Sequence, residues 1–260
     1  MGQTTDGQAL LDHVYAVVDA ATADAIEHSE FLPRIAQFDV QVVQSGDRSW
    51  RGRYLRGRRT YVEIFGPDDV AGAPDHASGL GLATRRRGDL EVLAGRMGEA
   101  ADRADRGSTT SEFHGEVGPW FDYLEVAGET SILSTWIMEY LRDPTDDARR
   151  VAQFDEWAPA ATGPVLGDLT RVEIDAVAGE IDLALPLLQA AEFRVRRDDD
   201  LVMASDGHAT IVLRSCTAAQ SGMRRLEFRL ASPTDEVVVE ELGRSTFTLG
   251  PGEQAAWEFA

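Results

Sequence analysis

The 260-residue sequence contains a single cysteine, Cys216, and no lysine, so its cationic side chains other than histidine are all arginines. One cysteine excludes an intrachain disulfide and a cysteine-rich zinc site. No apolar run approaches the roughly 20 residues of a membrane-spanning helix. The N-terminal residues lack the cationic start and the uninterrupted apolar stretch of a secretory signal. We therefore expect a cytoplasmic protein.

Positive charge is also scarce. The chain has 25 arginines against 45 acidic residues, a formal net charge of −20. Binding to nucleic acid or to an anionic membrane needs a cationic face, so we expect neither as a partner. The groups at 56–59 and 85–87 are interpreted as solvated turn charge, because runs of charge usually face water. The content of 43% hydrophobic residues is ordinary for a soluble globular protein.

One order of elements, a strand followed by a helix and three strands, recurs along the chain. Apolar and aromatic patterns predict it first over residues 11–65 and again over residues 79–141. A shortened form follows from residue 169, as one fuller unit and one abbreviated unit. A repeat of this length indicates that each unit is one structural module. We expect a domain of paired modules at 1–145, a connector at 146–167 and a degenerate domain at 168–260.

The segments DHVYAVVD, GRRTYVEIFGP, SGLGLATRRRGDLEVLAGRM and STWIMEYL resemble the vicinal-oxygen-chelate superfamily, which includes glyoxalase I, extradiol dioxygenases and bleomycin-resistance proteins. More narrowly, HVYAVVDAAT, TYVEIFGP and PWFDYLEV with IMEYL look like an actinobacterial glyoxalase-like group of unassigned function. The resemblance implies an α+β fold of tandem βαβββ modules, whose curved mixed sheets surround a cleft. The later half of the chain would be a second, degenerate pair of modules.

In metal-dependent members of the superfamily, the ligands come from the first and last strands of each module. Carried over by position, the resemblance implies His13, Glu63 and Glu139 as ligands of a divalent metal, with Fe, Mn, Ni and Zn as candidates. The two glutamates would also be catalytic groups that move a proton. The fourth position falls at Gly79 or a neighbour, a departure from the pattern. His76, just upstream, is the substitute ligand if its segment folds into the cleft.

Each ligand also has a structural interpretation. His13 would be a strand histidine hydrogen-bonded to its neighbours, and Glu63 would form an ion pair with Arg53 on the neighbouring strand. Strand alternation predicts that Thr135, Ile137 and Glu139 share one face. The aromatic residues that we expect to line a substrate cleft are Tyr54, Tyr61, Phe65, Trp120 and Tyr123.

The leading functional hypothesis is a metal-dependent isomerase or lyase that acts on a small oxygen-rich metabolite. The rival is a metal-free protein that binds and sequesters a small molecule, for which the acidic composition favours a cationic, planar ligand. A third possibility is a scaffold that has lost its active site. The partner in the first two cases is a small molecule, and the chain would act as a monomer or a homodimer.

Overall fold

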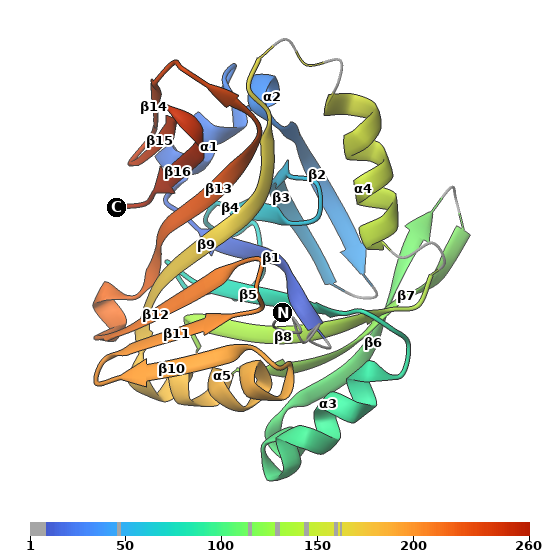
Figure 1. The fold of residues 1–260 in the computed structure, drawn as a ribbon. Coiled ribbons are helices and arrows are strands. Elements are labelled where there is room, and N and C mark those ends of the chain that lie inside the picture. Colours follow the sequence, from blue (N-terminus) through green and yellow to red (C-terminus); the bar gives the residue numbers. More distant parts are fainter. Residues whose placement is uncertain are drawn as a thin grey trace, which may run out of the picture.

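The computed structural model describes residues 9–45, 48–113, 116–127, 131–142, 146–158, 161 and 163–260. Its strands form two eight-stranded mixed sheets (Figure 1). Among the described residues, no helix has both the length and the apolar character that crossing a membrane requires.

The first sheet contains the first two modules, in the strand order β2-β3-β4-β1-β5-β8-β7-β6. Its elements are β1 (Ala9–Val17), α1 (Ala20–Glu27), α2 (Leu32–Ile35), β2 (Gln37–Ser45), β3 (Arg48–Arg56), β4 (Tyr61–Phe65), β5 (Ser78–Thr84), α3 (Asp89–Met97), the 3-10 helix η1 (Gly98–Arg103), β6 (Asp105–Phe113), β7 (Glu116–Val126) and β8 (Leu133–Tyr140). Within each module the first and last strands are parallel. The two modules join through the antiparallel pair β1 and β5.

The second sheet repeats this order as β10-β11-β12-β9-β13-β16-β15-β14. Helix α4 (Asp146–Trp157) precedes its elements, which are β9 (Leu166–Val177), α5 (Ala178–Ala190), β10 (Arg194–Asp198), β11 (Leu201–Ser205), β12 (Thr210–Cys216), the 3-10 helix η3 (Ala218–Gln220), β13 (Gly222–Thr234), β14 (Val238–Leu242), β15 (Ser245–Leu249) and β16 (Gly252–Glu258). Over residues 222–258 the last module passes from β13 to β14 without a helix. The predicted class, tandem βαβββ modules with an abbreviated last unit, is confirmed.

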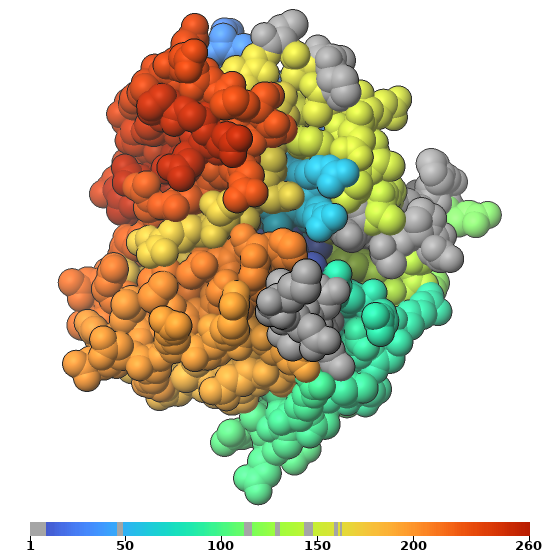
Figure 2. Space-filling view, viewed as in Figure 1, coloured from blue at the N-terminus to red at the C-terminus, as the bar shows by residue number. Residues whose placement is uncertain are grey.

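The hydrophobic core lies between the two sheets and is formed by side chains from one face of each sheet. Val14 and Leu80 of the first sheet belong to the same buried cluster as Val172 and Ile174 of the second. Helix α5 packs against both α3 and β8, so it bridges the two halves (Figure 1). In Figure 2 the atoms of the second half, coloured yellow to red, pack directly against those of the first.

The other face of the first sheet encloses the cleft. The sheet curls until its edge strands β2 and β6 contact each other. Residues alternate between the two faces along each strand. Val62 and Ile64 of β4 therefore enter the core, whereas Tyr61, Glu63 and Phe65 line the cleft.

A close backbone contact joins the turn after β3 to the start of β9. The amide of Arg58 donates to the carbonyl of Gly167 at 3.3 Å, and Asp168 accepts from the amide of Thr60 at 3.0 Å. A Cβ at Gly57 would lie 1.7 Å from the Gly167 oxygen. This position requires glycine because the two backbones approach each other directly.

We expect Gly57→Ala to lower the free energy of unfolding by about 1–3 kcal/mol, because the backbones must move apart. The matched control is Gly95→Ala, since a Cβ at Gly95 in α3 meets no atom within 4 Å. There, alanine should stabilise the helix by about 0.5–1 kcal/mol. Urea unfolding of both variants measures the difference. Wild-type stability in Gly57→Ala would contradict the contact.

Candidate functional site

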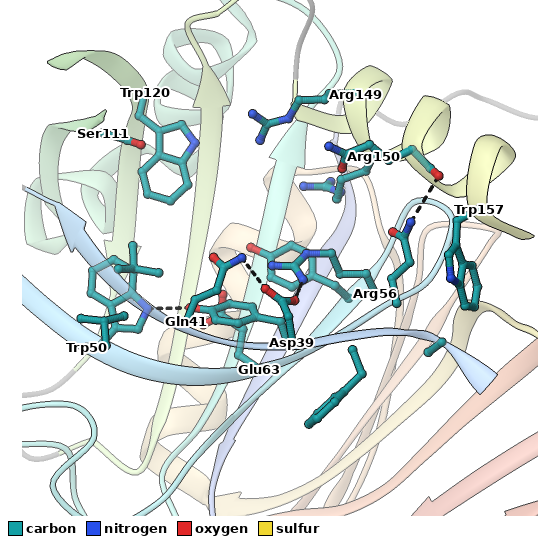
Figure 3. Close-up of a pocket in the computed structure, with 18 of the residues that line it drawn as sticks. Asp39, Gln41, Trp50, Arg56, Glu63, Ser111, Trp120, Arg149, Arg150 and Trp157 are labelled. Carbon is teal, nitrogen blue, oxygen red and sulfur yellow. Dashed lines mark hydrogen bonds and ion pairs between the residues drawn. The ribbon is translucent and has the colours of Figure 1, made fainter. Parts of the chain in front are cut away.

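The cleft consists of two connected chambers on the concave face of the first sheet. The narrower one, the aromatic chamber, has a volume of ≈ 270 Å³, and the wider one, the arginine chamber, has a volume of ≈ 870 Å³ (Figure 3). Trp50, Tyr61, Glu63, Trp120 and Tyr140 line both chambers. The two chambers therefore adjoin each other.

His13 of β1 lies at the base of the aromatic chamber and is 5% exposed. Its ring stacks on Tyr61 at a centroid distance of 4.4 Å and meets the edge of Trp136 at 5.0 Å. The ring lies over Gly81 of β5, where a Cβ would come within 2.5 Å of it. The glycines of β5, found where the resemblance implies a fourth ligand, thus make room for side chains of β1.

Asp12 points to the same side of β1 as His13, although neighbouring strand residues normally face opposite sides. The pairing of β1 with β5 shifts its register between Leu11 and His13, which is a β-bulge. The Asp12 carboxylate lies 2.7 Å from His13 Nδ1, accepts from the Tyr140 hydroxyl at 3.2 Å and forms an ion pair with Arg150 of α4. All of these groups are buried.

This ion pair favours the ionised form of Asp12, which forms a dyad with His13. Burial raises the pKa of Asp12, but Arg150 and His13 lower it by more, so the net shift is downward. An ionised Asp12 places the histidine proton on Nδ1. The Nε2 atom of a neutral His13 is then a proton acceptor.

Glu63 of β4 stands between Tyr61 and Phe65 in the wall of the cleft. Burial raises its pKa, and the opposing effects of His13, Arg56 and a hydrogen bond from Tyr61 do not cancel this rise. The proposed ion pair with Arg53 is not formed. Arg53 instead binds Glu27 at 2.8 Å and Asp69 at 2.6 Å.

The other two expected ligands do not join His13 and Glu63. Glu139 faces the helices, where its carboxylate accepts a hydrogen bond from the backbone amide of Leu90 at 3.0 Å, at the start of α3. The neighbouring residues of β8 line the cleft instead: Trp136, Met138 and Tyr140. His76 lies in the loop after β4, beside Gly222 and a separate cavity.

The described residues therefore do not assemble the metal site that the resemblance implies. Within them, no three histidine, cysteine, aspartate or glutamate side chains are grouped so that they could hold a metal ion. Asp12 cannot complete a set with His13 and Glu63, because its two oxygens already bind His13 and Arg150. A divalent ion there would also compete with the buried guanidinium.

The aromatic residues expected in the cleft are found in its walls. Tyr61, Phe65, Trp120 and Tyr123 line the aromatic chamber, and Tyr54 lines the arginine chamber, where its hydroxyl accepts from the indole of Trp50 at 2.9 Å. Sequence reasoning missed Asp12, Trp136, Arg56, Arg149 and Arg150. Arg56 is half-buried in the cavity wall, so its interpretation as solvated turn charge was wrong.

The raised pKa of Glu63 predicts how stability depends on pH. The native state holds this proton more tightly than the unfolded chain, so ionisation favours unfolding as the pH rises above the ordinary value of 4.5. Glu63→Gln removes this contribution. Unfolding at a series of pH values should show wild type losing stability relative to Glu63→Gln as the pH rises. A constant difference would contradict the burial of this carboxyl group.

Comparison with solved structures shows a similar fold in a hypothetical protein from Staphylococcus aureus, with a TM-score of 0.58, 7% identity and coverage of 94% of this chain and 99% of that chain. A variant of homoprotocatechuate 2,3-dioxygenase from B. fuscum matches with a TM-score of 0.42 and 12% identity, over 82% of this chain and 55% of that one. A 4-hydroxymandelate synthase variant from Streptomyces coelicolor has a TM-score of 0.42 and 15% identity, over 95% and 90% of the two chains. At 7% identity, the similarity to the Staphylococcus aureus protein is one of fold.

No curated protein matches the sequence. A family model does, and it extends over residues 11–259, from the start of β1 to the end of the second sheet. The chain belongs to the family of unknown function DUF5829.

Proposed function

We propose that this protein binds a small organic molecule with a flat aromatic part in the cleft of the first sheet. The observation that carries the proposal is the aromatic chamber, whose rings surround the polar groups of His13 and Glu63. Apolar walls with a few converging polar groups are typical of small-molecule sites. Aromatic side chains also gain energy by packing against another ring.

The side chains of the cleft favour binding without a metal ion, which was the rival hypothesis from the sequence. Of the expected metal ligands, His13 and Glu63 lie in the aromatic chamber. The carboxylate of Glu139 instead binds the backbone amide of Leu90 at the start of α3. The ligand would be held by ring packing and by hydrogen bonds to the chain's own groups.

A second candidate function is proton transfer, as in an isomerase or lyase. The hydrogen bond between His13 and Asp12 favours it, since a histidine fixed by a carboxylate is a competent general base. Glu63, with its raised pKa, would supply a proton from the neighbouring strand β4 in the same chamber. A proton donor and a proton acceptor held in one site are the usual basis of acid–base catalysis.

Binding is tested with 2-naphthol and chelator-treated protein, followed by tryptophan fluorescence, because Trp50, Trp120 and Trp136 line the cleft. We expect saturable binding and a raised melting temperature. Trp120→Ala should weaken binding about tenfold through the loss of one wall. Glu139→Ala should destabilise the protein by about 1 kcal/mol but leave affinity unchanged.

Two results would overturn the binding proposal. One is the absence of saturable binding. The other is stoichiometric metal in protein purified without chelators that is lost in Glu63→Ala, because the cleft would then be organised around the ion.

Proton transfer is tested with 1-phenylpropan-2-one in deuterated buffer, by following exchange at the carbons beside the carbonyl with NMR. The second function predicts exchange faster than in buffer alone, and loss of that acceleration in His13→Gln. Binding of 2-naphthol by the same variant shows that its cleft is intact. Exchange at the buffer rate with wild-type protein would leave binding as the only function.

A further inference from the structure

The arginine chamber concentrates positive charge in a strongly acidic protein. Its described lining contains three cationic side chains, Arg56, Arg149 and Arg150, and two carboxyl groups, those of Asp39 and Glu63. Across the whole chain the ratio is reversed, with 25 basic and 45 acidic residues. The excess of basic over acidic residues in the described lining of this cavity is therefore opposite to the charge balance of the whole chain.

The three guanidinium groups converge from two elements. Arg149 and Arg150 are consecutive residues of α4, and both extend toward the cavity, while Arg56 at the end of β3 approaches from the sheet (Figure 3). Burial lowers the pKa of Arg56, and repulsion from Arg150 and Arg149 lowers it further, against the opposing effects of Tyr61 and Glu63. Like charges are thus held close together in a partly enclosed space.

Two nearby carboxylates pair with guanidinium groups of the chamber. Asp39 pairs with Arg56, and Asp12, behind the chamber wall, pairs with Arg150. Glu63 is shifted toward its neutral form by burial. In addition, the buried Nε of Arg150 has no hydrogen-bond partner among the described residues, although the side chain is only 9% exposed. A buried donor of this kind is costly unless it is satisfied.

We propose that the cleft recognises an aromatic carboxylate, with its ring in the aromatic chamber and its carboxylate among the three arginines. This inference rests on the proposed binding function and adds the charge and orientation of the ligand. The chambers adjoin at the five residues that line both, so the proposed ligand would lie across this shared wall. Guanidinium groups match the planar, forked geometry of a carboxylate. The expectation of a cationic ligand, drawn from the acidic composition, is replaced by an anionic one.

The test compares two probes of equal shape, 3-phenylpropanoate and 3-phenylpropanamide, by isothermal titration calorimetry at low and high salt. We expect the carboxylate to bind on the order of tenfold more tightly than the amide. This preference should shrink at high salt. Arg149→Gln should abolish it by weakening the carboxylate alone, and Arg56→Gln provides a second variant if Arg149→Gln does not fold.

The matched control is Arg196→Gln, which removes the same charge from an exposed position on β10. It should preserve the preference. Equal affinity for the two probes, or a preference that survives both cleft variants, would overturn the inference and leave aromatic binding intact. Binding of neither probe, while 2-naphthol still binds, would also overturn it. If 2-naphthol does not bind either, the proposed function itself fails.

Discussion

The buried ion pair between Asp12 and Arg150 is the interaction on which the cleft depends. It ties α4 to the first strand of the sheet across residues that lie 138 positions apart. It keeps Asp12 ionised, which fixes the proton of His13, and it holds Arg150 over the ring of Tyr61 at 5.1 Å. Removing either partner would leave the other charge buried and uncompensated, a change that commonly costs about 3–5 kcal/mol. The same pair therefore supports the fold and organises the polar groups of the site.

Much of the fold could be predicted because it depends on patterns that repeat. The order of strand, helix and three strands is visible in the sequence, and the abbreviated last module follows from the lack of a helical pattern between β13 and β14. Strand β10 was missed because its sequence, RVRRD, has little apolar character. It is an edge strand, and edge positions do not require buried side chains.

The site was less predictable because a shift of one position along a strand moves a side chain from the cleft to the opposite face of the sheet. Glu63 follows strand alternation and lies in the cleft, whereas Glu139 belongs to the opposite face of its strand. Both glutamates interrupt apolar strands, so the sequence alone could not distinguish a cleft residue from a group that caps a helix. Asp12 reaches His13 and Arg150, behind the wall of the cleft, only through a bulge, which has no signal in the sequence. Arg149 and Arg150 lie in a polar segment that resembled a connector.

The two sheets share a topology but differ in the polar side chains along their strands. In the second sheet, polar strand positions hold charged pairs such as Arg171 with Glu173 and Arg225 with Glu227. Leu213, which corresponds to Glu63 when the turn glycines are aligned, is buried in the core. The described residues of the second half thus offer no counterpart to the dyad of Asp12 and His13. The residues that line the two chambers all lie before residue 160, in the first half of the chain and in α4.

The glycines of β5 determine how deep the cleft is. Rings from β1 lie flat over this strand because Gly79 and Gly81 carry no side chains, and a Cβ at Gly79 would come within 2.1 Å of the Tyr15 ring. A single methyl group at either position would push an aromatic ring into the space of the chamber. The volume of the aromatic chamber is therefore set by two missing side chains. Variation at these two positions among related proteins would be expected to track the volume of this chamber.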